Sequence, residues 1–151
     1  MSNFVYTAGL RNVGSYQVSG TPFVTGSSNL DDEKVHMVEF PYVSKSVTVI
    51  NINPNSGEDI RVHFQSGSAT AVTVAGDTGA QTTVEAGDVL GRFHFITVPS
   101  GFASVTFDVK CTKLYISQNT NTNDLGYQVF AELTQIPAAS MYSLTGSGIT
   151  E

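Results

Sequence analysis

The chain has 151 residues, the length of one domain that can bury a core without disulfide staples. Charged residues make up only 13% of it, the net charge is −6, and the seven basic residues are scattered. These values argue against a protein that binds nucleic acid regardless of sequence, and against one that binds anionic membranes. With one cysteine, Cys111, and no basic leader after Met1, we expect synthesis in a cytoplasm and no intrachain disulfide.

Residues 1–30 differ from the rest of the chain. Aromatic residues such as Phe4, Tyr6, Tyr16 and Phe23 stand among glycines and Pro22, which interrupt every strand-like stretch. The pattern predicts an extended arm with aromatic anchors that lies along this domain or a neighbouring copy. An ordinary first strand followed by loops is the alternative.

Residues 31–136 show the period of two that is typical of half-buried strands. Val105, Phe107 and Val109, for example, alternate with polar residues. About eight strands at this spacing favour an all-β fold, an antiparallel β-sandwich that is jelly-roll-like, with an immunoglobulin-like strand order as the alternative. Residues 137–151 form a tail that packs on its own domain or on a neighbour. The predicted strands cover residues 34–40, 46–53, 60–66, 71–75, 81–85, 92–98 and 127–136, with a pair of strands within residues 102–118.

One short motif matches the catalytic triplet of aspartic proteases, Asp77-Thr78-Gly79. That chemistry needs two carboxylates that share a proton, and Gly76 stands where an apolar strand residue is expected. Asp-Thr-Gly is equally a good hairpin turn, which is the better account of this segment.

The three histidines, His36, His63 and His94, have no close ligand spacing, and the run from Asp31 to Glu33 lacks the alternating ligands of a calcium loop. Alternation places His63 and His94 on the outer faces of their strands, where we expect bonds to water or to a neighbouring subunit. No nucleophile elbow is present either. We therefore expect no enzyme activity, no cofactor and no metal.

Because we expect neither catalysis nor metal binding, contact with other proteins is the remaining class of function. Phe130 and Ile96 are large apolar residues on the nominally outer faces of their strands, which indicates a subunit interface or a sheet buried on both sides. Together with the aromatic anchors of the arm and tail, they direct attention to protein contacts. The candidate interface residues are Phe4, Tyr6, Tyr16, Phe23, Phe130, Met141, Tyr142 and Leu144.

The chain resembles a family of small virion structural proteins of tailed phages that infect marine bacteria, notably cyanobacteria. The similarity runs along the whole length and is weakest at residues 67–87 and 119–124. The stretches that carry it are residues 4–20, Lys45-Ser-Val-Thr-Val-Ile, Asp59-Ile-Arg-Val-His-Phe, residues 93–98, 109–117 and 131–137, and the terminal residues 141–151.

The resemblance implies a non-enzymatic component of the virion and carries over no catalytic residues. A capsid decoration (cement) protein is the leading version, bound to neighbouring subunits and to the capsid, with a trimer as the favoured homo-oligomer. The alternatives are a tail, fibre or vertex component, or a soluble module that binds a glycan or receptor. Neither nucleic acid nor membrane is an expected partner.

Overall fold

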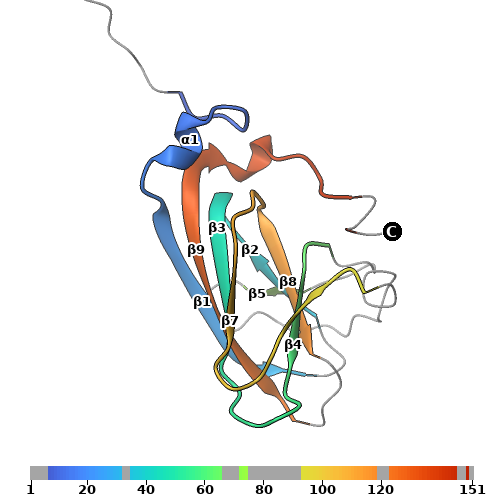
Figure 1. Cartoon of the computed structure of the whole chain (residues 1–151). Coiled ribbons are helices and arrows are strands. Elements are labelled where there is room, and N and C mark those ends of the chain that lie inside the picture. Colours follow the sequence, from blue (N-terminus) through green and yellow to red (C-terminus); the bar gives the residue numbers. More distant parts are fainter. Residues whose placement is uncertain are drawn as a thin grey trace, which may run out of the picture.

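Two β-sheets face each other in the computed structural model, which describes residues 7–31, 35–65, 72–74, 93–118, 123–145 and 149 (Figure 1). This confirms the all-β sandwich that the alternation predicts. None of the described helices is long and apolar enough to span a membrane. The elements are α1 (Gly14–Gln17), β1 (Thr21–Leu30), β2 (His36–Glu39), β3 (Tyr42–Asn51), β4 (Ile60–His63), β5 (Val72–Val74), β6 (Ile96–Val98), β7 (Ser104–Phe107), β8 (Lys113–Gln118), β9 (Leu125–Pro137) and the 3₁₀ turn η1 (Ala138–Ser140).

The strand order is that of a jelly roll. One sheet has four strands in the order β1-β9-β3-β7, and the other has five in the order β5-β2-β8-β4-β6. Neighbouring strands are antiparallel except for β5, which pairs with β2 in parallel. If β5 is set aside, the chain changes sheet at every step except between β4 and β6, as in a double-sheet jelly roll.

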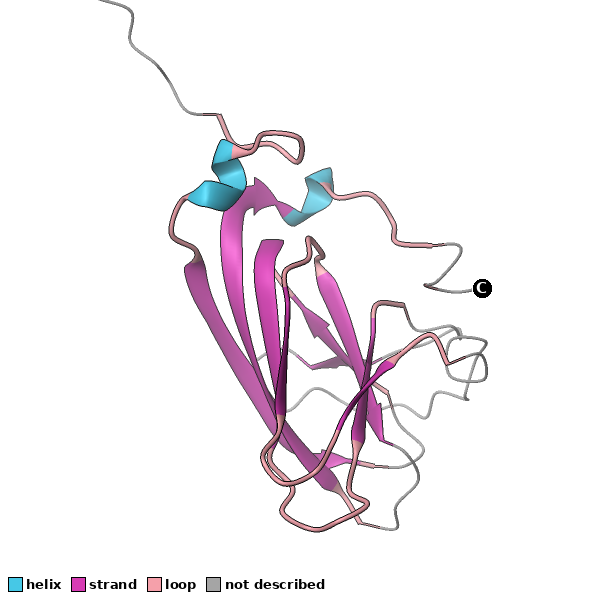
Figure 2. Ribbon diagram, in the orientation of Figure 1, coloured by secondary structure: helices cyan, strands magenta, loops and turns pink. Residues whose placement is uncertain are grey.

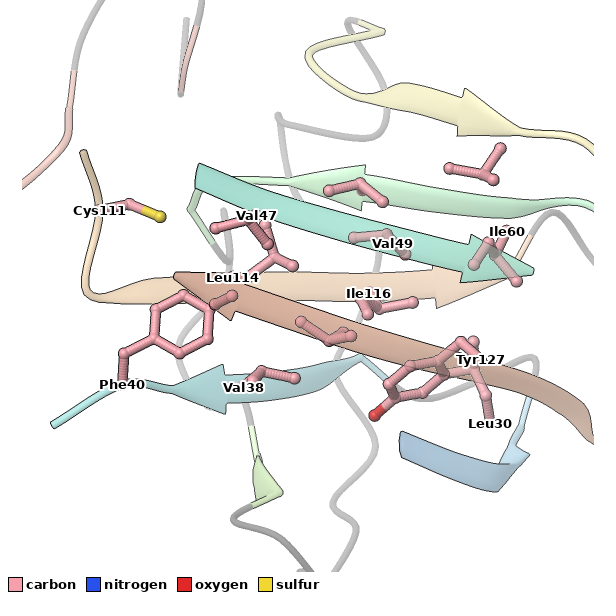
Figure 3. Close-up of a cluster of buried hydrophobic side chains, with 14 of the residues drawn as sticks. Leu30, Val38, Phe40, Val47, Val49, Ile60, Cys111, Leu114, Ile116 and Tyr127 are labelled. Atoms are coloured by element: carbon pink, nitrogen blue, oxygen red, sulfur yellow. The ribbon is translucent and has the colours of Figure 1, made fainter. Parts of the chain in front are cut away.

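The core lies between the sheets because alternate residues of each strand point inward. On β9, Tyr127, Val129 and Ala131 are buried while Gln128 and Phe130 are exposed. Leucine, isoleucine and valine side chains of the facing sheet complete the core, as Figure 3 shows for Leu114 and Ile116 of β8. Each such side chain contributes about 1.5–3 kcal/mol when fully buried.

The first strand of the sandwich lies within the segment assigned to the arm. Residues Thr21–Leu30 form β1, which pairs with β9 from Thr21↔Leu133 to Leu30↔Leu125. Residues 1–30 therefore do contain a strand of the sandwich, as the alternative expected, but within the described residues this strand follows the irregular segment instead of preceding it. Of the two strands expected between residues 71 and 85, the first is seen as β5, and the second lies outside the described residues.

Two buried asparagines tie four chain segments together at one end of the sandwich. The Asn51 amide nitrogen donates to the carbonyl oxygens of Glu58 at 2.9 Å and Val98 at 3.0 Å. Asn53 donates to Asn51 Oδ1 at 2.6 Å and to the carbonyl oxygen of Gly126 at 2.9 Å, and it accepts from the Gly126 N–H. The ends of β3 and β6 and the starts of β4 and β9 are thereby joined by side-chain amides.

Replacing Asn51 with alanine should lower the free energy of unfolding by about 2–4 kcal/mol, because two buried carbonyls lose their donor. Urea denaturation followed by fluorescence would measure the change. Asn55→Ala is the matched control, since this exposed side chain donates only to the Glu58 carboxylate. Equal denaturation midpoints for the two variants would contradict this account of the network.

Candidate interaction surface

The strands of the four-stranded sheet lie side by side, in the order β1-β9-β3-β7 (Figure 2). On the outward face of this sheet, a row of uncharged side chains crosses all its strands. Val24 of β1 pairs with Phe130 of β9, Phe130 with Thr48 of β3, and Thr48 with Thr106 of β7. Val24 is 70% exposed and Phe130 is 39% exposed. A β-branched and an aromatic residue opposite each other form a favourable cross-strand pair, so the row is apolar at the β1 side and hydroxyl-rich at the β7 side.

The rows on either side add little charge. One consists of Pro22, Glu132 and Ser46, and the other of Gly26, Gln128, Ile50 and Ser104. The Glu132 carboxylate is the single charged group in these three rows, and it accepts a hydrogen bond from Ser46 Oγ at 2.8 Å. We call the three rows together the outer face. Apart from Glu132, a partner that covers this surface removes no charged side chain of the three rows from water.

The structure separates the predicted interface residues. Phe130 lies on the outer face, but Phe23 points to the other side of β1 and packs edge-on against Phe40, with ring centroids 5.2 Å apart. Tyr16 is half-buried and its hydroxyl donates to the carbonyl oxygen of Leu10 at 2.9 Å. Phe4 and Tyr6 lie outside the described residues.

The tail residues lie apart from the outer face. Leu144 packs against the core and its carbonyl accepts from the Gln65 amide at 3.1 Å. Tyr142 is 58% exposed with Lys110 Nζ 5.9 Å from its ring, and Met141 is half-buried. With Phe64, Thr112, Lys113 and Tyr115, these tail residues line an open groove of about 330 Å³.

Among the described residues, sequence reasoning missed six exposed large apolar residues, Val13, Val18, Val24, Tyr42, Phe93 and Phe102. Alternation with Phe23 was the signal that could have found Val24. Phe93 and Phe102, which precede and follow β6, are 79% and 64% exposed. Both have a left-handed backbone, with φ of 60° and 61°, a conformation that is strained for bulky residues. The sequence contains no pattern that predicts this conformation. Ile96 is 47% exposed, but the expectation that it lies on the outward side of its strand is wrong. It pairs with Val62 of β4 and has the parity of Val98, and both of these residues lie in the core, so Ile96 is on the core side of β6.

His63 is a correction to the sequence analysis. It does lie on the outward side of β4, but it is completely buried, stacks on Tyr115 at 5.8 Å and has protein partners for both ring nitrogens. Nδ1 lies 2.8 Å from the carbonyl oxygen of Gln65, and Nε2 lies 3.2 Å from Ser117 Oγ. Burial lowers the pKa of His63 to about 4. The ring is therefore neutral near pH 7.

Among the described residues, the groups most suited to nucleophilic chemistry are the Ser117 hydroxyl beside His63 and the Cys111 thiol beside Ser44, and both are buried. Ser117, beside His63, is only 3% exposed, so no substrate carbonyl can reach its hydroxyl. Cys111 is fully buried, its sulfur lies 3.3 Å from Ser44 Oγ, and burial raises the pKa of its thiol to about 11. A thiol with that pKa is almost entirely protonated at neutral pH and is a poor nucleophile.

The described residues hold no group of three His, Cys, Asp or Glu side chains arranged for a metal. His36 is buried and lies 2.9 Å from the Tyr127 hydroxyl, a bond that joins β2 of one sheet to β9 of the other. Asp77, Thr78 and Gly79 lie outside the described residues, as do residues 32–34. No family model, no curated protein and no solved structure matches the chain.

Acid should destabilise the protein between about pH 6.5 and 4 through His63. Because its pKa is 6.5 in the unfolded chain and about 4 in the fold, the unfolded state binds more protons in this range, and stability falls as the pH is lowered. The full effect is about 3 kcal/mol. Urea unfolding of the wild type and His63→Gln at pH 8 and pH 4.5 would measure it. If the two proteins lose equal stability on acidification, His63 is not the cause.

Cys111 should be unreactive in the native protein. We expect a disulfide-exchange reagent to label it at least about 100-fold more slowly than in the urea-unfolded chain, since the thiol is buried and protonated. The absorbance of the released chromophore follows the reaction. Comparable rates with and without urea would show that the β7–β8 connection opens readily.

Proposed function

We propose that the protein is a non-enzymatic structural component of a tailed-phage virion, and within it a capsid decoration protein. The observation that carries the proposal is the outer face, an exposed and nearly charge-free sheet surface centred on Val24 and Phe130. The resemblance to small virion proteins of marine phages and the jelly-roll strand order, which many viral capsid domains share, support the same conclusion.

The dimensions of the outer face fit the contact of one subunit with one neighbour. Four strands about 4.8 Å apart span about 19 Å, and the ten residues of β1 extend about 33 Å, so the whole outward side of this sheet, of which the outer face is the middle part, covers at most roughly 600 Å². A standard interface covers about 800 Å² on each partner. The face and its rim can therefore seat one neighbouring protein and leave the other sheet free for further contacts.

A decoration protein stays bound to its particle through several weak contacts rather than one strong contact. Once one surface of a subunit is bound to a shell, its remaining surfaces meet their partners at a high effective concentration. Exposed apolar residues outside the outer face, such as Phe93 and Tyr142, are available for such secondary contacts. The groups best suited to nucleophilic chemistry, by contrast, are buried and inaccessible.

Co-sedimentation of the purified chain with tail-less phage heads tests the proposal. The wild type should pellet with heads, and Phe130→Glu should lower the bound fraction at equal concentration at least about tenfold, because a carboxylate would be buried in the contact. Phe102→Glu is the matched control, an exposed aromatic residue on the turn before β7 that lies outside the outer face.

The outcomes separate the hypotheses. A wild-type chain that stays in the supernatant with heads but pellets with isolated tails would replace the capsid assignment with the tail or fibre alternative. Equal losses for Phe130→Glu and Phe102→Glu would show that the outer face is not the contact. Urea unfolding of both variants verifies that each is folded.

A further inference from the structure

The edge of strand β1 is long and unprotected. β1 spans ten residues and stands at the end of its sheet, so among the described strands it has a neighbour on one side only, β9 (Figure 1). The pairing is regular from Thr21 to Ser27 and shifts between Ser27 and Leu30. Along this stretch the free side of the strand offers backbone N–H and C=O groups with the spacing that another strand needs.

Natural proteins block such edges with charged side chains, prolines, bulges or very short strands. β1 contains no charged residue, and its one proline, Pro22, stands near the start. The irregularity after Ser27 lies at the other end. The middle of the strand, around Val24, has none of these protections.

We propose that the β1 edges of two copies of this chain pair antiparallel about a two-fold axis at Val24. This register uses the whole regular stretch, because Val24 is the midpoint between Thr21 and Ser27. It places Pro22 opposite the second copy's Gly26. The four-stranded sheets of the two copies then become one continuous sheet. This pairing rests on the proposed function, which requires contact with a neighbouring copy.

The side chains favour this register. Val24 meets its own symmetry mate on the outward side, so the apolar pair Val24–Phe130 continues across the axis into the same pair of the second copy. Cross-strand pairs of β-branched and aromatic residues each contribute roughly 0.2–1 kcal/mol. Although each copy has a net charge of −6, the strands that meet carry no charge, so close contact brings no like charges together.

Strand length favours a two-fold contact over a head-to-tail ring. The other edge of the same sheet is β7, which also runs antiparallel to an approaching β1 but has only four residues. It could pair with less than half of the ten-residue β1, whereas a second β1 matches its full regular stretch. A self-complementary contact of this kind closes as a dimer.

The size of the contact sets the expected strength. Seven paired residues extend about 24 Å in a sheet about 10 Å thick, so each copy contributes roughly 250 Å² in section, well under the 800 Å² of a standard interface. The dimer should therefore be weak in dilute solution and become populated where copies are held close together, as on a particle. A covalent trap is the suitable assay.

Disulfide trapping of the purified chain, without particles, tests the inference. Facing residues of paired strands have Cα atoms about 4.5–5.5 Å apart, within the range of a disulfide. Val24→Cys should therefore form a covalent dimer under mild oxidation at least about tenfold faster than Thr106→Cys. Thr106 is the matched control, because it is exposed, lies in the same row and stands on the opposite edge of the sheet. The native cysteine, Cys111, is buried and leaves the background low.

Each outcome of the trapping experiment either supports or contradicts the two-fold pairing. Fast dimer formation by Val24→Cys alone supports the two-fold pairing, and a slower reaction when Val24→Cys also carries Ser27→Lys strengthens it. Equal rates for Val24→Cys and Thr106→Cys would reveal random collision and overturn it. A ladder of oligomers that forms only when Val24→Cys and Thr106→Cys are combined in one chain would replace it with a β1–β7 ring, such as the trimer expected in the sequence analysis. None of these results alters the co-sedimentation test, so the two proposals fail separately.

Discussion

The register of β9 is the constraint on which both the core and the surface depend. This 13-residue strand pairs with β1 on one side and β3 on the other, so it fixes the positions of both neighbours. Its odd-numbered residues from Tyr127 to Leu133 fill the core, and Phe130 between them lies on the outer face. A slip of one residue would exchange the two sets. The hydrogen bond between the Tyr127 hydroxyl and His36 Nδ1 then holds this register against the opposite sheet.

Alternation in the sequence predicted most strands because burial of one face imposes a period of two. It failed at β1 for a physical reason. Pro22 and Gly26 lower the intrinsic preference of this segment for a strand, yet pairing with β9 overrides that preference. Strand order was equally beyond the sequence, since residues far apart in the chain decide which edges meet. The jelly-roll order therefore had an immunoglobulin-like alternative until the pairs were known.

The candidate site was predictable only in part for a related reason. Alternation tells which side of a strand a residue faces, but not what covers that side. Phe130 and His63 both lie on outward sides, yet one is 39% exposed and the other is fully buried. Val24 escaped notice because its neighbour Phe23 is the larger aromatic residue, although Phe23 packs against Phe40 in the interior. Residue size was a poorer guide to the surface than strand parity.

The distribution of charge explains how a chain with a net charge of −6 can offer a surface to its own copies. Of the described charges, Glu39, Arg61 and Lys113 lie on the five-stranded sheet, whereas Lys45 and Glu132 lie on strands of the four-stranded sheet and none lies on β1. Facing sheets are about 10 Å apart, and exposed charges of one sheet interact with the outside of the other mainly through the surrounding salt solution, in which the screening length is about 8 Å at physiological salt. The charges of the five-stranded sheet therefore contribute little repulsion at the β1 edge, where the proposed pairing would bring two uncharged strands together.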